Sequence, residues 1–235
     1  MLADVLLQIV KKIVEDSDID LWETMWCDSD KDYEFEGPFV KDWRVGHVRA
    51  GATKLCLFLR YAPNMIIKIP FLGAVDEEFS SETEFKRANL CYKKFASNTW
   101  DYCLTECGLF QEARRLGIDK CFAGTYYIGS IDNYPIYASV KIPNCFYDCG
   151  ESKSTEQSME LGKKIIASKP TSFGDITPNL LGLFIDSYGY DIAKRLFDFI
   201  DKYGIRDFHD GNIARMDSGE IKIIDYSGYN ESIYL

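Results

Sequence analysis

Near the end of the chain, the stretch IRDFHDGNI (residues 205–213) is followed by IIDYSG (residues 223–228). Three of the polar side chains in these segments matter most: Asp207, Asn212 five positions later, and Asp225 thirteen positions beyond that. The β-branched run directly before Asp225 is typical of a strand, which would present this carboxylate at its end. Carboxylate and amide oxygens are ligands that Mg²⁺ accepts in proteins. The pattern therefore predicts a hairpin that carries oxygen ligands.

Phosphoryl transfer needs this spacing, because one carboxylate orients a hydroxyl nucleophile while two further oxygen groups hold Mg²⁺ against the phosphates. The D-x-H-x-x-N pattern that begins at Asp207, followed by the strand and Asp225, resembles the protein kinase-like superfamily. It is similar to the small-molecule branch that includes the aminoglycoside phosphotransferases. The resemblance implies that Asp207 is the catalytic base and that His209 supports the loop geometry. It also implies that Asn212 and Asp225 are the metal ligands.

Two positions depart from the pattern of this family. Ile205 stands where a histidine would precede the base by two positions, and the glycine of the D-F-G triplet comes one place late, at Gly228. Neither departure removes a group that would bind metal or phosphate. An ordinary turn is the alternative interpretation, because Asp-Gly and Asp-Ser-Gly are common where strands reverse.

Residues 45–59 predict a strand, a turn that contains glycine, and a return strand. The resemblance implies that this hairpin covers the nucleotide phosphates, with Gly46 and Gly51 letting backbone N–H groups approach the anion. A plain hairpin is the alternative, because these two glycines do not form a G-x-G-x-x-G motif.

Lys68 lies in the middle of the next strand pattern, residues 64–70. A lysine flanked by isoleucines either snorkels from an edge strand or points its ammonium group into a cleft. Its place after the hairpin favours the cleft, and the resemblance implies the phosphate-binding lysine of a V-A-I-K-like sequence. A helix is predicted from residue 76 or 80 to residue 95, and the resemblance implies that Glu82 or Glu84 on it holds Lys68. Glu84 could instead close a capping box, and solvent exposure is the alternative for either carboxylate.

Residues 97–120 predict a connector with a short helix from 108 to 116. Aromatic and β-branched runs at 122–128 and 135–142, separated by a turn at 129–133, predict a hairpin that completes an antiparallel sheet. The resemblance then implies that residues 141–144 form the hinge between two lobes. Backbone groups of Lys141 and Ile142 would bind adenine there.

Helical patterns appear at residues 2–14, 154–168, 179–187 and 190–203, and Gly204 is placed to cap the last of these helices. The first helix is amphipathic, which predicts that it packs on the domain. A helix that binds a membrane or a partner is the alternative.

Composition excludes some classes of protein. The chain has 235 residues, of which 46% are hydrophobic, and a net charge of −10 that disfavours binding to nucleic-acid phosphates. Eight cysteines without a secretion signal predict reduced thiols and a cytoplasmic protein, and zinc is not expected. No apolar run approaches the roughly 18 residues of a membrane span.

Together these observations predict an α+β, two-lobed kinase-like fold. Residues 1–142 would hold an N-terminal extension and a small lobe, and residues 143–235 a reduced helical lobe without the long C-terminal part that binds acceptors in the family. The expected activity is transfer of the γ-phosphate of ATP, with Mg²⁺, to an acceptor that carries a hydroxyl. A nucleotide-binding pseudokinase that regulates a partner, and an interaction protein with chance motifs, are the alternatives.

Overall fold

The computed structural model describes residues 2–25, 36–51, 53–72, 101–142, 144–145, 153–169, 176–205 and 210–226. These residues divide into two compact units, and each is described by itself. The first unit takes its residues from Met1–Ser80, Lys93–Cys107 and Gly124–Lys141, and the second from Gly108–Ala123 and Ile142–Leu235. The second unit therefore resumes at Ile142, one residue before the start expected at residue 143. Residues 108–123 also group with the second unit.

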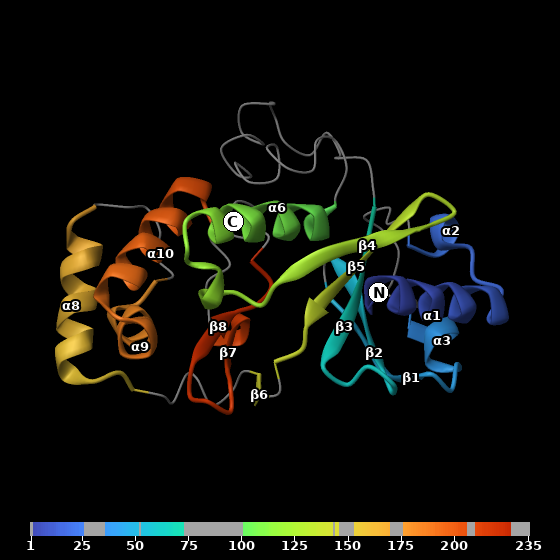
Figure 1. Ribbon diagram of the computed structural model, residues 1–235, viewed down its shortest axis with the longest axis horizontal. Coiled ribbons are helices and arrows are strands. Elements are labelled where there is room, and N and C mark those ends of the chain that lie inside the picture. Colours follow the sequence, from blue (N-terminus) through green and yellow to red (C-terminus); the bar gives the residue numbers. More distant parts are fainter. Residues whose placement is uncertain are drawn as a thin grey trace, which may run out of the picture. The chain divides into compact units, whose positions relative to one another are not determined.

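A five-stranded antiparallel sheet forms the centre of the first unit (Figure 1). Its strands are β1 (Val45–Ala50), β2 (Lys54–Leu59), β3 (Met65–Pro70), β4 (Thr125–Ile131) and β5 (Tyr134–Val140), in the order β1-β2-β3-β5-β4. Antiparallel pairing joins every neighbouring pair in this order. The α+β class and the antiparallel sheet predicted from the sequence are thus confirmed.

One face of this sheet builds the hydrophobic core of the first unit. Alternate residues of a strand point to the same face, so Leu55 and Leu57 of β2 share it with Ile67 and Ile69 of β3. This face is covered from the N-terminal segment, which contributes α1 (Leu2–Asp16), α2 (Leu21–Met25) and α3 (Glu36–Val40). Burial of each such aliphatic side chain contributes about 1.5–3 kcal/mol.

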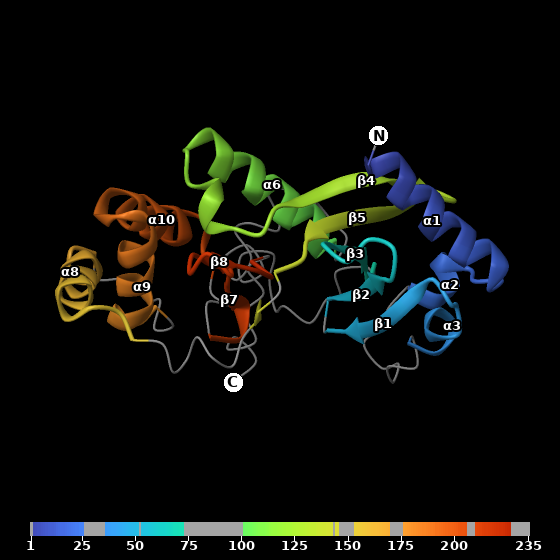
Figure 2. The ribbon, with the colours of Figure 1, turned by 60° about the horizontal axis from the view of Figure 1, so that its bottom comes forward.

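Helix α1 packs on the sheet, as its amphipathic pattern predicts (Figures 1 and 2). Val10 and Ile13 are fully buried in the same core as the strands, whereas Leu2, at the start of the helix, is 60% exposed. At Gly129 of β4 the helix comes so close that a Cβ atom would lie 2.4 Å from Leu7 Cδ2, and Gly129 has a φ of +140°. Leu7 Cδ2 is the end of a flexible side chain that can shift, so the positive φ is the main reason why glycine is favoured here.

The β4–β5 hairpin closes through a two-residue turn. Asp132 and Asn133 have φ values of 49° and 66°, the left-handed conformation that such turns require and that these residue types tolerate. Ile131 pairs with Tyr134 on either side of the turn. The predicted hairpin is confirmed, although β4 continues three residues into the segment expected to be the turn.

Helix α6 (Tyr102–Arg115) begins six residues before the helix predicted at 108–116. The missed signal is Asp101, whose Oδ1 accepts a hydrogen bond of 2.8 Å from Leu104 N, as a helix-capping side chain does. Cys103 and Cys107 then pack against Tyr137 of β5. The division between the two units falls within α6, after Cys107.

The second unit contains α8 (Glu156–Ala167), α9 (Pro178–Tyr188) and α10 (Tyr190–Tyr203), which lie together in Figure 2. All three were predicted. The side chain of Thr155 caps α8 and that of Thr177 caps α9, and Gly204 ends α10 with a φ of 63°. A small antiparallel sheet accompanies these helices, in the order β6 (Asn144–Cys145), β7 (Ile213–Arg215) and β8 (Ile221–Ile223).

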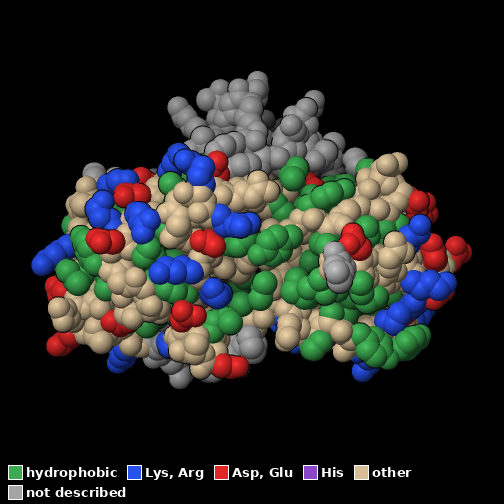
Figure 3. Space-filling view, viewed as in Figure 1, with side chains coloured by type: hydrophobic (Ala, Val, Ile, Leu, Met, Phe, Trp, Pro, Cys, Tyr) green, Lys and Arg blue, Asp and Glu red, His purple; other side chains and the backbone are tan. Residues whose placement is uncertain are grey.

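Charged side chains of both signs are interspersed on the face drawn in Figure 3, although the chain carries a net charge of −10. Among the helices that the structure describes, none has the length and apolar character needed to cross a bilayer. The expectation that nucleic acid is not a partner stays a prediction.

Candidate functional site

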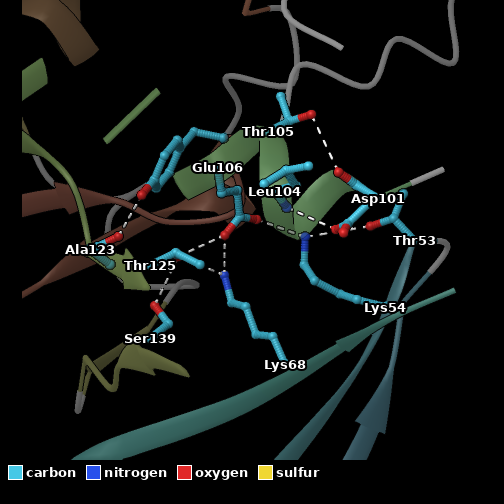
Figure 4. Close-up of polar contacts among 11 residues, drawn as sticks. Thr53, Lys54, Lys68, Asp101, Leu104, Thr105, Glu106, Ala123, Thr125 and Ser139 are labelled. Carbon is cyan, nitrogen blue, oxygen red and sulfur yellow. Dashed lines mark hydrogen bonds and ion pairs between the residues drawn. The ribbon is translucent and has the colours of Figure 1, made fainter. Parts of the chain in front are cut away.

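Glu106 of α6 lies at the centre of a buried polar cluster in the first unit (Figure 4). Its Oε1 accepts a hydrogen bond of 2.8 Å from Lys54 Nζ, and its Oε2 accepts one of 2.5 Å from Lys68 Nζ. The side chains of Glu106, Lys54 and Lys68 are 0%, 4% and 7% exposed. One carboxylate thus holds two ammonium groups away from water.

Strand pairing explains why the two lysines meet at this carboxylate. Lys68 of β3 lies directly opposite Cys56 of β2, and Lys54 is two residues from Cys56 on the same strand. Since side chains two apart share a face, both lysines point away from the core face that holds Leu55 and Ile67. Helix α6 packs over this second face and supplies Glu106.

Two hydroxyl groups complete the cluster. Thr125 Oγ1 of β4 donates to Glu106 Oε2 at 2.8 Å and also accepts a weak bond from Lys68 Nζ at 3.5 Å. Ser139 of β5 pairs with Thr125 across the two strands, and its Oγ lies 3.4 Å from Thr125 Oγ1. A third strand, β4, therefore contacts the carboxylate directly through Thr125, and Ser139 of β5 contacts Thr125.

The charge state of Glu106 follows from its surroundings. Burial by itself would raise the pKa of this carboxyl, but the nearby ammonium groups of Lys54 and Lys68 outweigh burial and hold the pKa of Glu106 well below its ordinary value. Glu106 is therefore ionised at neutral pH. Removal of one partner from such a buried ion pair typically costs about 3–5 kcal/mol.

Asp101 fixes the first turn of the helix that carries Glu106. Besides capping the helix, it accepts a hydrogen bond of 2.6 Å from Tyr137 Oη through Oδ2. Burial raises the pKa of Asp101, while the bond from Tyr137 lowers it in part. Burial and the neighbouring Asp101 raise the pKa of Tyr137, so its hydroxyl stays protonated and remains a donor.

In the second unit, the β7–β8 hairpin carries Asn212 and Asp225 at one end. Ile213 pairs with Ile223, and the ladder continues with a hydrogen bond of 2.8 Å from Ile224 N to Asn212 O. Asn212 directly precedes β7 and is buried, whereas Asp225 follows β8 by two residues. The predicted strand before Asp225 is confirmed.

The backbone at Asp225 is held in an uncommon conformation, with a φ of 47°. Left-handed residues that are not glycine occur in turns and at functional sites, where the surrounding structure maintains them. Here the next residue, Tyr226, is fully buried, donates from Oη to Ala123 O at 2.9 Å, and packs edge-on against Phe122 at 4.9 Å between ring centroids. This anchor holds the segment after β8.

The residues at this hairpin end suit a Mg²⁺ ion that also binds phosphate. An amide and a carboxylate offer hard oxygen atoms, and Mg²⁺ in nucleotide sites usually takes only one or two protein ligands, with water and phosphate oxygens completing its shell. Among the described residues, no group of three or more His, Cys, Asp or Glu side chains could hold a metal ion. An ion held by Asn212 and Asp225 would need these additional oxygens.

Four of the predicted site residues are not among those that the structure describes. Asp207, His209, Glu82 and Glu84 are outside the described residues. In the described part of the chain, the carboxylate bonded to Lys68 is Glu106, which the sequence did not single out.

The remaining predicted positions lie on β1 or within two residues after β1 or β5. Gly46 falls at an irregularity of β1, and Gly51 N donates to Lys54 O at 3.0 Å to close the β1–β2 turn. Lys141, in the first unit, donates from its backbone N to Asn64 O at 2.9 Å, and Ile142 begins the next segment of the second unit.

Neither a scan against protein-family models nor a search of curated proteins gives a match for this chain.

Proposed function

We propose that this chain is a kinase-like phosphotransferase, in which the first unit acts as the small lobe and the second as a helical lobe. The observation that carries the proposal is the buried pair between Lys68, on the third strand of an antiparallel sheet, and Glu106 on a helix. In protein kinases a lysine on the third strand contacts the phosphates of ATP and is held by a helix glutamate. The lysine is needed in its charged form, which a buried carboxylate stabilises.

The hairpin of the second unit supplies the other half of the proposal. Asn212 and Asp225 would hold Mg²⁺, which neutralises phosphate charge when it is bound. Asp207, three residues before the described hairpin segment begins, would orient the acceptor. Burial of Asn212 and the anchoring of Tyr226 keep the two proposed ligands at the same end of the hairpin.

The proposed reaction is an in-line displacement on the γ-phosphorus. The acceptor hydroxyl oxygen forms a bond to the γ-phosphorus. At the same time the bond between the γ-phosphorus and the β–γ bridging oxygen breaks, and a nucleoside diphosphate leaves. The hydroxyl proton passes to the carboxylate of Asp207. Lys68 stabilises the charge of the phosphate oxygens, and most of the rate gain comes from such positioning and electrostatics.

The first test is the response of the full chain to Mg·ATP. Binding at 100 times the dissociation constant stabilises a protein by about 2.7 kcal/mol. For a chain of this size, that stabilisation raises the melting temperature by roughly 5–11 °C. Asp225→Asn should lose this rise, whereas Asp217→Asn, the same change in the turn at the other end of the hairpin, should keep it. Equal rises for wild type and Asp225→Asn would reject the metal assignment.

Turnover distinguishes an enzyme from a regulatory module. Wild-type protein is incubated with ATP and Mg²⁺ or Mn²⁺, and ADP release and the intact mass of the protein are measured. Release of ADP or a mass gain of one phosphoryl group supports the phosphotransferase. Binding without either product supports the nucleotide-binding pseudokinase instead, and a wild type without affinity for ATP rejects both.

A further inference from the structure

We infer that Lys54 is a second phosphate-binding residue, which shares the carboxylate of Glu106 with Lys68. This inference rests on the proposed function and adds to it a contact that neither the sequence pattern nor the family resemblance assigns.

The first support is the convergence of the two ammonium groups. Lys54 Nζ and Lys68 Nζ bond to the two different oxygens of Glu106, at 2.8 and 2.5 Å. Figure 4 shows both side chains reaching the carboxylate from the sheet. Two ammonium groups on one carboxylate are close enough to contact neighbouring oxygens of a single polyphosphate chain.

The second support is the place of Lys54 in the β1–β2 hairpin. Lys54 is the first residue of β2, and its carbonyl oxygen accepts the bond from Gly51 N that closes the turn. The adjacent Thr53 O accepts a bond of 3.0 Å from the N–H of Phe71, the residue that follows β3. Lys54 therefore projects from the base of the glycine-containing turn that is proposed to cover the phosphates.

The third support is that each lysine has a contact that phosphate could replace. Lys54 Nζ lies 3.4 Å from Thr53 Oγ1, and Lys68 Nζ lies 3.5 Å from Thr125 Oγ1. Bonds of this length are weak, whereas bonds between an ammonium group and a phosphate oxygen are short and strong. A phosphate can therefore replace these contacts while both bonds to Glu106 remain.

A purely structural role is the competing explanation, in which Lys54 only ties α6 to the sheet. The two explanations differ in how the affinity depends on the number of phosphates. Loss of a phosphate contact weakens the binding of ATP more than that of adenosine, whereas loss of a structural contact weakens both alike.

The experiment measures binding of ATP, ADP, AMP and adenosine to the full chain by calorimetry, in the presence of Mg²⁺. Lys54→Met keeps the length of the side chain and removes its charge. We expect this variant to lose about 10- to 100-fold in affinity for ATP, and less than 3-fold for adenosine. Lys163→Met, which removes an exposed lysine from α8, is the control and should bind all four ligands as wild type does.

A second measurement uses wild-type protein, so that it does not depend on the folding of a variant. An acyl phosphate of ATP transfers its acyl group to a neighbouring lysine amine, forming an amide with loss of a proton and release of ATP. Peptide mass mapping should find both Lys54 and Lys68 acylated, and excess ATP should prevent this at both positions. Labelling at Lys163 should not respond to ATP.

The outcomes separate this inference from the function on which it rests. Wild-type protein that does not bind ATP overturns the proposed function and, with it, the role of Lys54. Wild-type protein that binds ATP, with Lys54→Met unchanged or equally weakened for adenosine, overturns only the role of Lys54. Acylation of Lys68 without Lys54 does the same.

Discussion

Replacement of Glu106 by glutamine tests the electrostatic centre of the first unit. The change keeps the shape of the side chain and removes its charge. A glutamine has one amide oxygen to accept a bond and an NH₂ group that only donates. Whichever way the amide is oriented, one of Lys54 and Lys68 meets a donor where a carboxylate oxygen now lies 2.8 or 2.5 Å away.

The expected cost follows from the burial of this cluster. Glu106 is fully buried and both lysines are less than one tenth exposed, so water does not replace the lost bonds. Breaking a buried ion pair costs about 3–5 kcal/mol. Deprotonation of one lysine in the variant would bring this destabilisation toward the lower end of the range, because a neutral amine is less costly to bury than an ammonium group. For a chain of this length the change lowers the melting temperature by roughly 6–20 °C.

Urea unfolding followed by tryptophan fluorescence is the appropriate assay. Trp22 and Trp43 lie in the first unit, and the described residues of the second unit contain no tryptophan, so the signal follows the unit that holds Glu106. A matched control in the same unit is Glu15→Gln on α1, where Glu15 pairs with Lys11 at 3.9 Å but both side chains are more than half exposed. Exposed pairs contribute at most about 1 kcal/mol, so the control should differ little from wild type.

Stability measured at acidic pH provides an independent check that the ionised carboxylate of Glu106 stabilises the protein. The pKa of Glu106 is lower in the folded protein than its ordinary value of 4.5, because of Lys54 and Lys68. Its stabilising contribution is therefore complete above the pKa of the unfolded chain and is lost as the pH falls below about 4.5 toward the folded pKa. The stability difference between wild type and Glu106→Gln should shrink over that range. A difference below 1 kcal/mol at pH 7, or one that grows in acid, would refute the reasoning.

Three further predictions concern other parts of the chain. Asp207→Ala should slow phosphoryl transfer by on the order of 10²–10⁴ while calorimetry finds ATP affinity largely intact, and an unchanged rate would remove Asp207 from the role of base. Thr125→Val should destabilise the first unit by about 1.5–3 kcal/mol in urea, because it removes the hydroxyl that donates to Glu106. Ile13→Ala should cost about 2–5 kcal/mol in the same assay, while Leu2→Ala, on the exposed end of the same helix, should stay within 0.5 kcal/mol; equal effects would argue against the packing of α1 on the sheet.

The elements that were predicted correctly depend on interactions between close neighbours in the sequence. The amphipathic spacing of α1, the Asp132-Asn133 turn and Gly204 each act within a few residues. The hairpin that carries Asn212 and Asp225 was predicted for the same reason, because a β-branched run and a turn sequence lie next to each other. Such signals can be recognised without knowledge of the tertiary structure.

The sequence by itself determined the α+β class, the antiparallel hairpins, the helices of the second unit, and the position of Lys68 on a strand. Only the tertiary structure decided that Lys68 bonds to Glu106, 38 residues away, and that Lys54, 52 residues from Glu106, bonds to the same carboxylate. Long-range pairing depends on strand register and on which helix face meets the sheet, and these are set by the burial of many side chains together.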